Sequence, residues 1–600
     1  MVHELRERKD IPAEYKWKLE DIFSSNEEWE KTFLEAEKLI GFAEKYRGKL
    51  AESPDLFVEC LEWSDNLSLN IEELYTYARM RRDEDNRIAV YQGMTDKASM
   101  LSVRAGSALS FIVPEILAMP EDRLQDLRKD PRLEIYNHYL ENIIRQKDHV
   151  LSLAEEKLLA EASELASAPS NIFSMANDAD LKIGYISDEQ GNQVELTKGN
   201  FIKYMESTNR RVRKEAFQTL YTAYGRQINT WAAMLNSSVK ADVFFARVRR
   251  YNSAIEAALD NDNVPLTVYD SLISTVNEFL PQFHRYLRLR RQVLGLDELH
   301  MYDIYVPLVP ELDTHIPFAE AKAIVKEGLQ PLGEEYLKVL ELGYNSGWID
   351  IYENIGKTSG AYSWGTYKSH PYVLLNHQDT LDSLFTLAHE MGHALHTYFS
   401  NKNQIHLYAG YKIFVAEVAS TLNESLVIQH LINTTKDNKM KAYLLNHYLE
   451  QFRGTVFRQT MFAEFEKMTH TALESNQALT AEYLSQIYRD LNHKYYGAEV
   501  KIDEEIAIEW ARIPHFYNAF YVYKYATGFS AATALAHQIL KEGSPAVDRY
   551  MTFLASGGSD YPINLLRKAG VDMEKPEPVR QALEVFTALL NQLEKLLTNW

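Results

Sequence analysis

The residues of this chain best suited to chemistry lie in the segment HEMGH at positions 389–393. Apolar residues around it repeat at intervals of three and four, so the sequence predicts a helix. Positions four apart on a helix share a face, and His389 and His393 would therefore project side by side. Two imidazoles at that spacing can ligate one Zn²⁺, while Glu390 between them can take a proton from metal-bound water.

The surroundings of this motif predict a buried helix. LFTLA precedes the motif, AL follows it, and Asp379 or Thr380 can cap the start of the helix. Buried imidazoles beside a buried carboxylate need partners, which a cation supplies. Gly392 inside a helix costs about 1 kcal/mol relative to alanine. We therefore expect another part of the chain to approach closely at that position.

The third protein ligand of a catalytic zinc site has two candidates, Glu417 and Glu424. Positions that hold glycine and histidine in metzincins carry His396 and Phe399 here, which excludes that class. The two glutamates lie seven residues apart in the next predicted helix and hence on one face. Either could bind the metal, and the other could orient a ligand histidine. His396, one turn beyond His393, is expected to support a ligand or to lie in the core.

A second group of polar aromatic residues lies in IPHFYNAFYVYKYATGF, positions 513–529. His515 opens it, and Tyr517, Tyr521 and Tyr525 follow at intervals of four. An aromatic stripe at helical spacing is usually core, yet each buried phenol needs a hydrogen-bond partner. Phenol and imidazole donors can also stabilise the oxyanion formed when a peptide bond is attacked at zinc. Both interpretations stay open on spacing alone.

The elements that must position these residues are predicted to be mainly helices. Only 25 Gly and 18 Pro interrupt 600 residues, which favours long helices. Helical periodicity extends over positions 26–49, 55–82, 90–128, 150–167, 266–296 and 578–599. Strands are predicted as a hairpin at 182–197 and as one or two strands at 360–376. The hairpin marks a predicted domain boundary, with residues 1–195 before it and residues 196–600 after it.

Charge and composition exclude several classes of function. There are 64 Lys and Arg against 85 Asp and Glu, a net charge of −21, opposite in sign to that of a nucleic-acid-binding protein. A single cysteine, Cys60, excludes an intramolecular disulfide framework and an all-cysteine zinc site. The first residues lack the apolar stretch of a secretory signal, and no run of about 18 uncharged apolar residues is evident. We expect a cytoplasmic protein that binds neither nucleic acid nor membrane.

Beyond the motif itself, several segments resemble the M3 metallopeptidases. They are SGAYSWGTY and HPYVLLN before the motif, FVAEVASTLNE after it, and IPHFYNAFYVYKYATG further on. EYKWKLEDIFSSNEEWE near the start and FLASGGSDYPINLLRKAGVDM near the end are typical of the oligoendopeptidase F branch of that family. The resemblance extends from about residue 11 to the end of the chain.

The resemblance implies a mainly helical clamshell of the zincin type, with a deep substrate channel and a few small strands near the active site. Residues 1–195 would form one wall of that channel, and residues 196–600 would form the catalytic domain. One Zn²⁺ per chain is implied. Its ligands would be His389, His393 and Glu417, with Glu390 as general base and Glu424 supporting a ligand histidine.

The resemblance also implies how a substrate is held. The backbone of the peptide would pair, as an added β-strand, with the strand around Gly360, Ala361 and Tyr362. The oxyanion would be held by His515 together with one or two of Tyr517, Tyr521 and Tyr525.

The implied activity is zinc-dependent endopeptidase hydrolysis of short unstructured oligopeptides by a monomer or small homo-oligomer. A related helical zinc carboxypeptidase is the nearest alternative. A non-catalytic peptide-binding zincin is a second alternative, against which the intact Glu390 counts, because such a protein needs no base.

Overall fold

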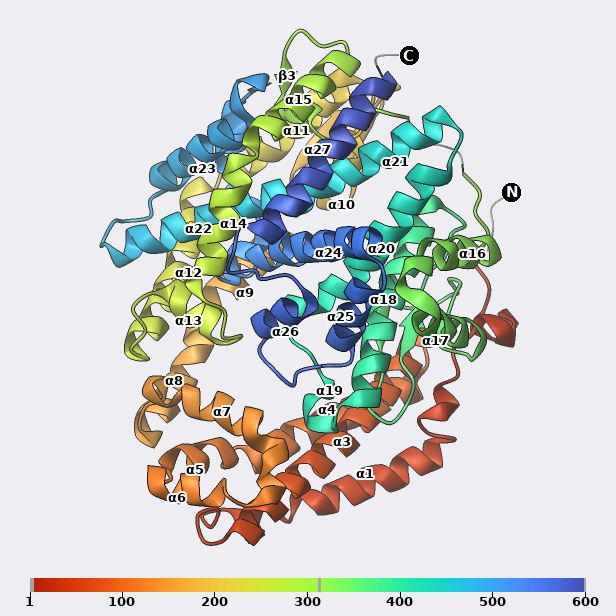
Figure 1. Cartoon of the computed structure of the whole chain (residues 1–600). Helices are drawn as coiled ribbons and strands as arrows, with labels where there is room; N and C mark the ends of the chain where they lie inside the picture. The colour runs from red at the N-terminus through yellow and green to blue at the C-terminus, as the bar shows by residue number, and fades with distance from the viewer. Residues whose placement is uncertain (1–4, 311–313, 598–600) are drawn as a thin grey trace. The chain divides into compact units, whose positions relative to one another are not determined.

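The computed structural model describes residues 5–310 and 314–597, and helices make up most of them (Figure 1). Contacts between residues divide the chain into two compact units, each assembled from three segments. The first unit comprises Met1–Lys147, Thr314–His430 and Leu535–Gly570, and the second comprises Asp148–Asp313, Leu431–Ala534 and Val571–Trp600. The division falls inside two helices, α20 (Ile413–Thr434) and α24 (Tyr523–Glu542).

These units do not follow the boundary predicted at residue 195. That position lies within β2, and the hairpin packs on α11 (Arg210–Gly225), which belongs to the same unit. A hairpin that packs on the following helix joins two segments rather than separating them. The role of residues 1–195 as one wall of a channel stays a prediction.

The first unit contains the N-terminal helices and the helix of the HEMGH motif. Its helices are α1 (Asn26–Ile40), α2 (Ala43–Tyr46), α3 (Pro54–Glu84), α4 (Ala89–Leu109), α5 (Ile112–Ala118), α6 (Glu121–Leu127), α7 (Asn137–Arg145), α16 (Phe318–Gly328), α17 (Gly333–Asn345), α18 (Leu381–Asn403), α19 (His406–Ala409), α25 (Ser544–Leu554) and α26 (Pro562–Ala569). Figure 1 shows α1, α3 and α4 side by side in red and orange, and these three helices contact one another.

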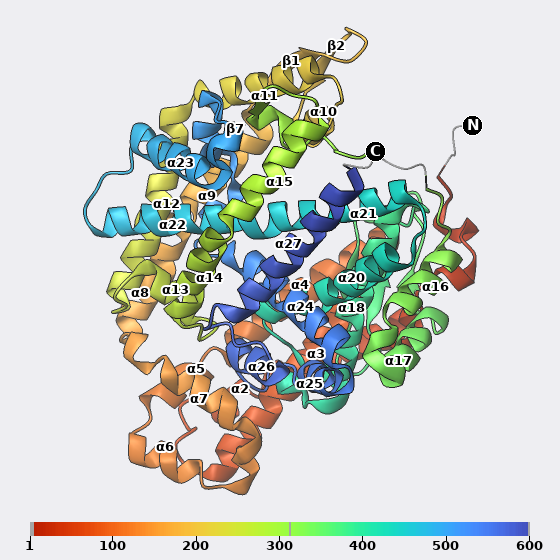
Figure 2. The same ribbon diagram turned by 45° about the horizontal axis from the view of Figure 1, so that its top comes forward.

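The second unit contains the predicted hairpin and the C-terminal helix. Its helices are α8 (Leu153–Ala166), α9 (Ala168–Ser174), α10 (Lys198–Met205), α11, α12 (Ile228–Val248), α13 (Ala254–Asp260), α14 (Leu266–Glu278), α15 (Leu280–Val293), α21 (Asn438–Gln451), α22 (Arg458–Glu474), α23 (Ala481–Tyr496) and α27 (Glu577–Leu597). The amphipathic face predicted for α27 packs on α14, α15 and α21 (Figure 2).

The predicted helices are confirmed, with interruptions that have local causes. Positions 90–128 form α4, α5 and α6 rather than one helix, and Pro120 lies between the last two. Proline lacks a backbone N–H and disfavours helical geometry at the preceding residue. Likewise α14 and α15 divide at Phe279, two residues before Pro281.

Both predicted strand regions are confirmed. The hairpin pairs β1 (Gly184–Ser187) with β2 (Gln193–Leu196), antiparallel. In the first unit β6 (Tyr372–Leu374) lies between β4 (Ile349–Asp350), which is parallel to it, and β5 (Tyr362–Trp364), which is antiparallel. In this three-stranded sheet β5 is therefore an edge strand, and it contacts α18. A further pair, β3 (Leu299–His300) and β7 (Val500–Lys501), lies in the second unit.

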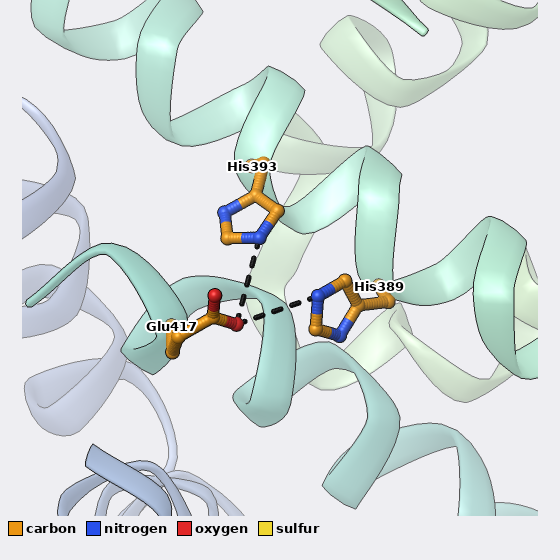
Figure 3. A group of neighbouring side chains, drawn as sticks. All are labelled: His389, His393 and Glu417. Atoms are coloured by element: carbon orange, nitrogen blue, oxygen red, sulfur yellow. Dashed lines mark ion pairs between the residues drawn. The ribbon is translucent and has the colours of Figure 1, made fainter. Parts of the chain in front are cut away.

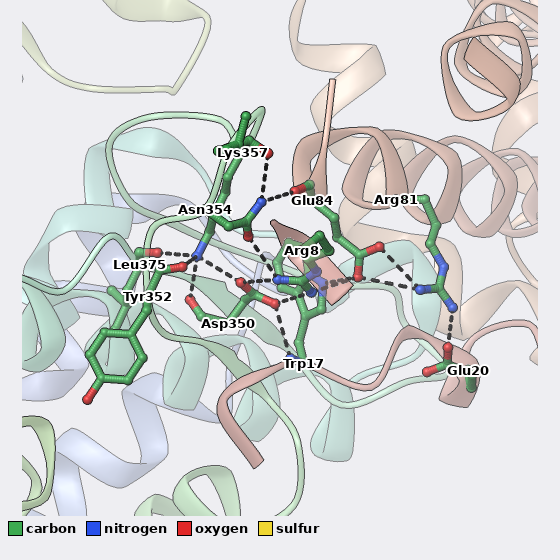
Figure 4. A network of polar contacts seen from close by, with 11 residues as sticks. Arg8, Trp17, Glu20, Arg81, Glu84, Asp350, Tyr352, Asn354, Lys357 and Leu375 are labelled. Carbon is green, nitrogen blue, oxygen red and sulfur yellow. Dashed lines mark hydrogen bonds and ion pairs between the residues drawn. The ribbon is translucent and has the colours of Figure 1, made fainter. Parts of the chain in front are cut away.

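A buried network of charged side chains joins this sheet to the N-terminal segment and to α3 (Figure 4). Arg8 pairs with both Asp350 of β4 and Glu84 of α3. Lys357 Nζ lies 2.7 Å from the Asp350 carboxylate and donates to the carbonyl oxygens of Tyr352 and Leu375 at 2.8 and 2.5 Å. Every charge in this group therefore has an opposite charge beside it.

The same network fixes the loop that leads into β5. Asp83 at the end of α3 accepts hydrogen bonds from the Thr358 hydroxyl at 2.8 Å and from the Tyr362 phenol at 2.9 Å, while its carbonyl accepts the Thr358 N–H. The Nδ2 group of Asn354 donates to the Glu84 carbonyl at 3.0 Å. These hydrogen bonds hold the loop before β5, and the start of β5 itself, against the end of α3.

One segment, Ala89–Ala118, is long and apolar enough to cross a membrane by length and composition alone. A third of its most apolar window is buried inside the structure. The segment is divided at Ser110–Phe111 into α4 and α5, and Phe111, Ile112 and Ile116 belong to the hydrophobic core of the first unit. Core helices of soluble proteins also pass such a test.

Candidate active site

The helix of the motif, α18, starts where a side chain caps it. The Thr380 hydroxyl accepts the backbone N–H of Ser383 at 3.1 Å, so Thr380 is the N-cap, one of the two residues predicted for that place. The preceding residue, Asp379, has a φ of +56° and turns the chain into the helix. As predicted, α18 is largely buried, and Glu390 is 7% exposed.

The close approach predicted at Gly392 is confirmed. A Cβ atom at this position would lie 2.6 Å from the Ser420 Cα and 2.8 Å from the Ala419 carbonyl oxygen, both in α20. Only glycine allows the two backbones to come this near. The contact brings α20 against the face of α18 that carries the two histidines, and so brings Glu417 and Glu424 near them.

His389, His393 and Glu417 come together in a group that can hold a metal ion (Figure 3). The Nε2 atoms of His389 and His393 lie 3.4 and 3.6 Å from Oε2 of Glu417. Zinc ligands at about 2.0–2.1 Å in a tetrahedron lie about 3.3–3.4 Å apart. The spacing and the two-nitrogen, one-oxygen donor set therefore fit zinc, with the fourth position left for water or substrate.

Glu424 occupies the supporting position predicted for one of the two glutamates. Its Oε1 lies 2.5 Å from Nδ1 of His389, which directs Nε2 toward Glu417. Burial alone would lower the pKa of His389, but the hydrogen bond that His389 donates to Glu424 and the charges of Glu424, Glu390 and Glu417 raise that pKa to about 9. The group therefore attracts positive charge strongly.

The other two carboxylates of the group differ in environment. Burial opposes the charge of Glu417, but the neighbouring imidazoles and a hydrogen bond from Ser420 lower its pKa to about 2. Burial raises the pKa of Glu390 above its ordinary value. A raised pKa makes a carboxylate a stronger base, which accepts a proton more readily. Ser420 was not predicted, although its position three residues after Glu417 on one helix could have indicated this contact.

His396 lies in the core, which is one of the two roles predicted for it. It is 1% exposed and stacks on Tyr411 with the ring centroids 3.7 Å apart. Burial lowers its pKa to about 3, so the imidazole is neutral.

Gly360, Ala361 and Tyr362 lie at the edge strand as predicted. Tyr362 begins β5, and Gly360 has a φ of +83°, a conformation that glycine adopts without strain. The phenol of Tyr362 is tied to Asp83 and thus supports the strand. The backbone of β5 remains at the sheet edge.

The predicted oxyanion donors lie in the second unit, and they do not all lie on one helix. Residues Pro514–Tyr517 form a 3₁₀ turn, and α24 begins only at Tyr523. Phe520 between them has a φ of +56°, which breaks the helical repeat.

Within this segment the side chains have different surroundings. The Tyr525 phenol lies 3.4 Å from Nε2 of His515. The Tyr521 ring packs edge-on against Tyr525, with centroids 5.4 Å apart. Tyr517 instead stacks on Phe173 at 4.4 Å. His515, Tyr521 and Tyr525 therefore lie together, whereas the Tyr517 ring packs against Phe173.

The helical fold and the His-Glu group agree with comparisons to known families. Residues 203–585 match the model of peptidase family M3, and residues 115–183 match the model described as oligopeptidase F. The first match covers more than half of the chain, so the chain belongs to peptidase family M3 and is a peptidase. The mainly helical fold with few small strands that the sequence predicted is confirmed.

The chain is also similar to individual proteins that are named as oligopeptidases. The chain is 50% identical to oligopeptidase PepF of Bacillus subtilis over 596 residues, which cover 99% of this chain and 89% of the relative. It is 43% identical to group B oligopeptidase PepB of Streptococcus agalactiae, over 98% of each chain. The crystal structure of oligoendopeptidase-F from Enterococcus faecium matches with a TM-score of 0.75 and 40% identity, over 96% of this chain and 100% of that one.

Proposed function

We propose that this peptidase is a zinc-dependent endopeptidase that hydrolyses internal bonds of short, unstructured oligopeptides in the cytoplasm. The observation that carries this proposal is the group of His389, His393 and Glu417, whose donor atoms lie within 4.8 Å of one another on two buried helices. The relatives named as oligopeptidases, which align over nearly the whole chain, support the substrate class.

His389, His393 and Glu417 would hold the zinc. Bound there, zinc would supply a water molecule of lowered pKa and a positive charge for the carbonyl oxygen of the substrate. Glu424 fixes the tautomer of His389 by accepting the proton on Nδ1, which keeps the Nε2 lone pair free for the metal.

Glu390 is the proposed general base. It lies between the two histidines on α18 and is 7% exposed, so little bulk water reaches its carboxylate. As water attacks the scissile carbonyl, Glu390 takes the proton and then delivers it to the nitrogen of the leaving amine. The raised pKa of Glu390 suits both steps.

Two further groups of residues are proposed to hold the substrate. The free edge of β5 would pair with the extended peptide backbone, a mode that tolerates many sequences. His515 and Tyr525, with Tyr521 beside them, would donate hydrogen bonds to the oxyanion. Burial lowers the pKa of His515, so its imidazole is neutral and donates from one nitrogen only.

An end-blocked, internally quenched peptide tests this proposal directly, together with zinc analysis of the purified protein. We expect cleavage of an internal bond, loss of cleavage with a chelator, and recovery on addition of zinc. A carboxypeptidase would leave the blocked peptide intact and cleave only the free one. A non-catalytic peptide-binding protein would cleave neither. Gel filtration tests the proposed monomer or small homo-oligomer.

A further inference from the structure

A cavity of about 280 Å³ lies beside the edge strand, at the start of α18. Its lining comes from the loop before β5, from the chain after β6 and from the first turns of α18. The polar residues of that lining are Asn376, His377, Gln378, Thr380, Asp382, Ser383 and Thr386. None of the described residues that line it is Lys or Arg, and Asp382 is its one carboxylate.

The cavity lies on the same face of α18 as the proposed base. Asp382, Thr386 and Glu390 follow one another at intervals of four and so share a helix face. At a rise of about 1.5 Å per residue, Thr386 and Asp382 lie about 6 and 12 Å from Glu390 along the helix. An extended peptide advances about 3.3 Å per residue. The cavity is therefore within reach of a side chain about two to four residues from the bond that is cut.

One polar residue of the lining, Asn376, is held in place by the loop before β5. Nδ2 of Asn376 donates to the carbonyl oxygens of Thr358 and Gly360 at 3.0 and 2.8 Å, which fixes the orientation of the amide. Its Oδ1 is buried and accepts no hydrogen bond from any described residue. Because this atom has almost no accessible surface, the amide shapes the wall of the cavity and does not offer an acceptor to a ligand.

His377 also lines the cavity and is 6% exposed. Its Nε2 lies 3.4 Å from the Asp379 carboxylate. Burial lowers the pKa of His377, so the ring adds no positive charge. The one charge that the lining offers is therefore the carboxylate of Asp382.

We propose that this cavity is a substrate subsite that selects a positively charged side chain, lysine or arginine, on the peptide. Asp382 supplies the charge that pairs with it. Asn376 also holds the Gly360 carbonyl, two residues before β5, so the subsite lies beside the proposed backbone-binding edge. This inference rests on the proposed endopeptidase function and adds the class of side chain that the site prefers.

The test is a comparison of two side chains of similar length that differ in charge. Lysine and norleucine are placed in turn at the second, third and fourth positions on each side of the cut bond of a neutral, end-blocked, quenched peptide. In the wild-type protein we expect kcat/KM to favour lysine by roughly five- to tenfold at one of these positions, the effect of one partly exposed charged hydrogen bond. The ratio should fall as salt is added.

Two variants of Asp382 assign the preference to this carboxylate. Asp382→Asn should bring the lysine-to-norleucine ratio close to one, and Asp382→Lys should favour a glutamate peptide over the lysine peptide. Glu334→Gln is the matched control, because it removes the same charge from a side chain that is 91% exposed in the same unit. That variant should keep the wild-type ratio.

The outcomes separate this inference from the function on which it rests. If the neutral parent peptide is cut but lysine gives no advantage at any position, the subsite assignment is wrong and the endopeptidase proposal stands. A lysine preference that survives both Asp382 variants also overturns it. If no internal bond is cut in any peptide, the proposed function itself fails.

Discussion

Two groups of charged side chains lie in the first unit, and they differ in how their charges are balanced. In the network of Figure 4, the cations Arg8 and Lys357 meet the carboxylates of Asp350 and Glu84. In the group around α18, three carboxylates face two imidazoles. In the first group the positive and negative charges cancel, whereas the second group has an excess of negative charge that a bound cation would neutralise.

This difference separates a structural role from a functional one. A buried charge that loses its only partner is costly, so a balanced network chiefly fixes the backbone around it. A group with excess negative charge destabilises the metal-free protein, and binding of a cation removes that destabilisation. Substitutions in the first group should therefore change stability, and substitutions in the second should change metal content and activity.

The largest effect is expected from loss of a metal ligand. Glu417→Ala removes the only oxygen donor of the group in Figure 3. We expect zinc content to fall to a small fraction of the wild-type value and peptide cleavage to disappear, while the circular dichroism spectrum stays helical. Inductively coupled plasma mass spectrometry measures the metal. Full zinc content in this variant would show that Glu424 or another residue is the ligand.

Loss of the base is expected to have the next largest effect. Glu390→Gln keeps the shape of the side chain but cannot carry a proton, so kcat should fall by about 10²–10⁴-fold. Zinc content should stay at the wild-type value, since Glu390 is not among the three grouped ligands. Steady-state kinetics with zinc analysis on the same sample separates this variant from Glu417→Ala. Near-normal turnover would exclude Glu390 as the base.

On the other side of the comparison, Asp350→Asn should unfold the protein more easily without removing its metal. The variant leaves Arg8 and Lys357 buried without their shared carboxylate, a loss of about 3–5 kcal/mol by analogy with other broken buried pairs. Denaturant titration measures it, and Glu334→Gln serves as the exposed control. Zinc per folded chain should be unchanged. A wild-type midpoint for Asp350→Asn would remove the structural role assigned to the network.

The same carboxylate gives a pH dependence with a defined sign. Burial opposes its charge, but Lys357 and Arg8 outweigh burial and hold the pKa of Asp350 below its ordinary value. Its contribution to stability is therefore present above the unfolded-state pKa of about 3.9 and is lost as pH falls below it. The stability difference between wild type and Asp350→Asn should shrink in that acidic range.

A smaller effect is expected for Glu424→Gln. Glu424 contacts His389, one of the proposed zinc ligands, and is not among the three grouped donors, so its loss should weaken zinc affinity by about 10–100-fold rather than abolish it. Competition with a chelator of known affinity measures the change. Activity should return when excess zinc is added, unlike that of Glu390→Gln. An affinity equal to wild type would show that His389 needs no support from Glu424.

The two groups also differ in how far the sequence predicts them. The HEMGH spacing and Gly392 predict the ligand helix and the close approach of α20, because a helix places residues four apart on one face regardless of the rest of the fold. The sequence does not predict that Arg8 pairs with Asp350, 342 positions away, because only the tertiary fold brings them together. The break at Phe520 was missed because the left-handed backbone there has no signature in a bulky residue.

A third group of charged side chains surrounds His406. It resembles the proposed metal site in composition only, because it also combines histidine with carboxylates. The Nδ1 and Nε2 atoms of His406 lie 2.6 and 2.9 Å from the carboxylates of Asp65 and Glu72, so both ring nitrogens are occupied and no nitrogen is left to bind a metal ion. Burial would lower the pKa of His406, but the two carboxylates raise it to about 9. This clamp joins α19 to α3 and should behave like the network of Figure 4.

The smallest effect is expected for the His406 clamp. Its contribution to stability depends on pH with the opposite sign to that of Asp350. A pKa raised above the unfolded value of about 6.5 adds stability that is full below pH 6.5 and is lost as pH rises through about 9. We expect His406→Gln to cost roughly 1–2 kcal/mol near pH 6 and much less near pH 10, with zinc content unchanged. His315→Gln, at an exposed histidine, is the control. A loss that does not depend on pH would mean that packing of the ring, and not its charge, stabilises this contact.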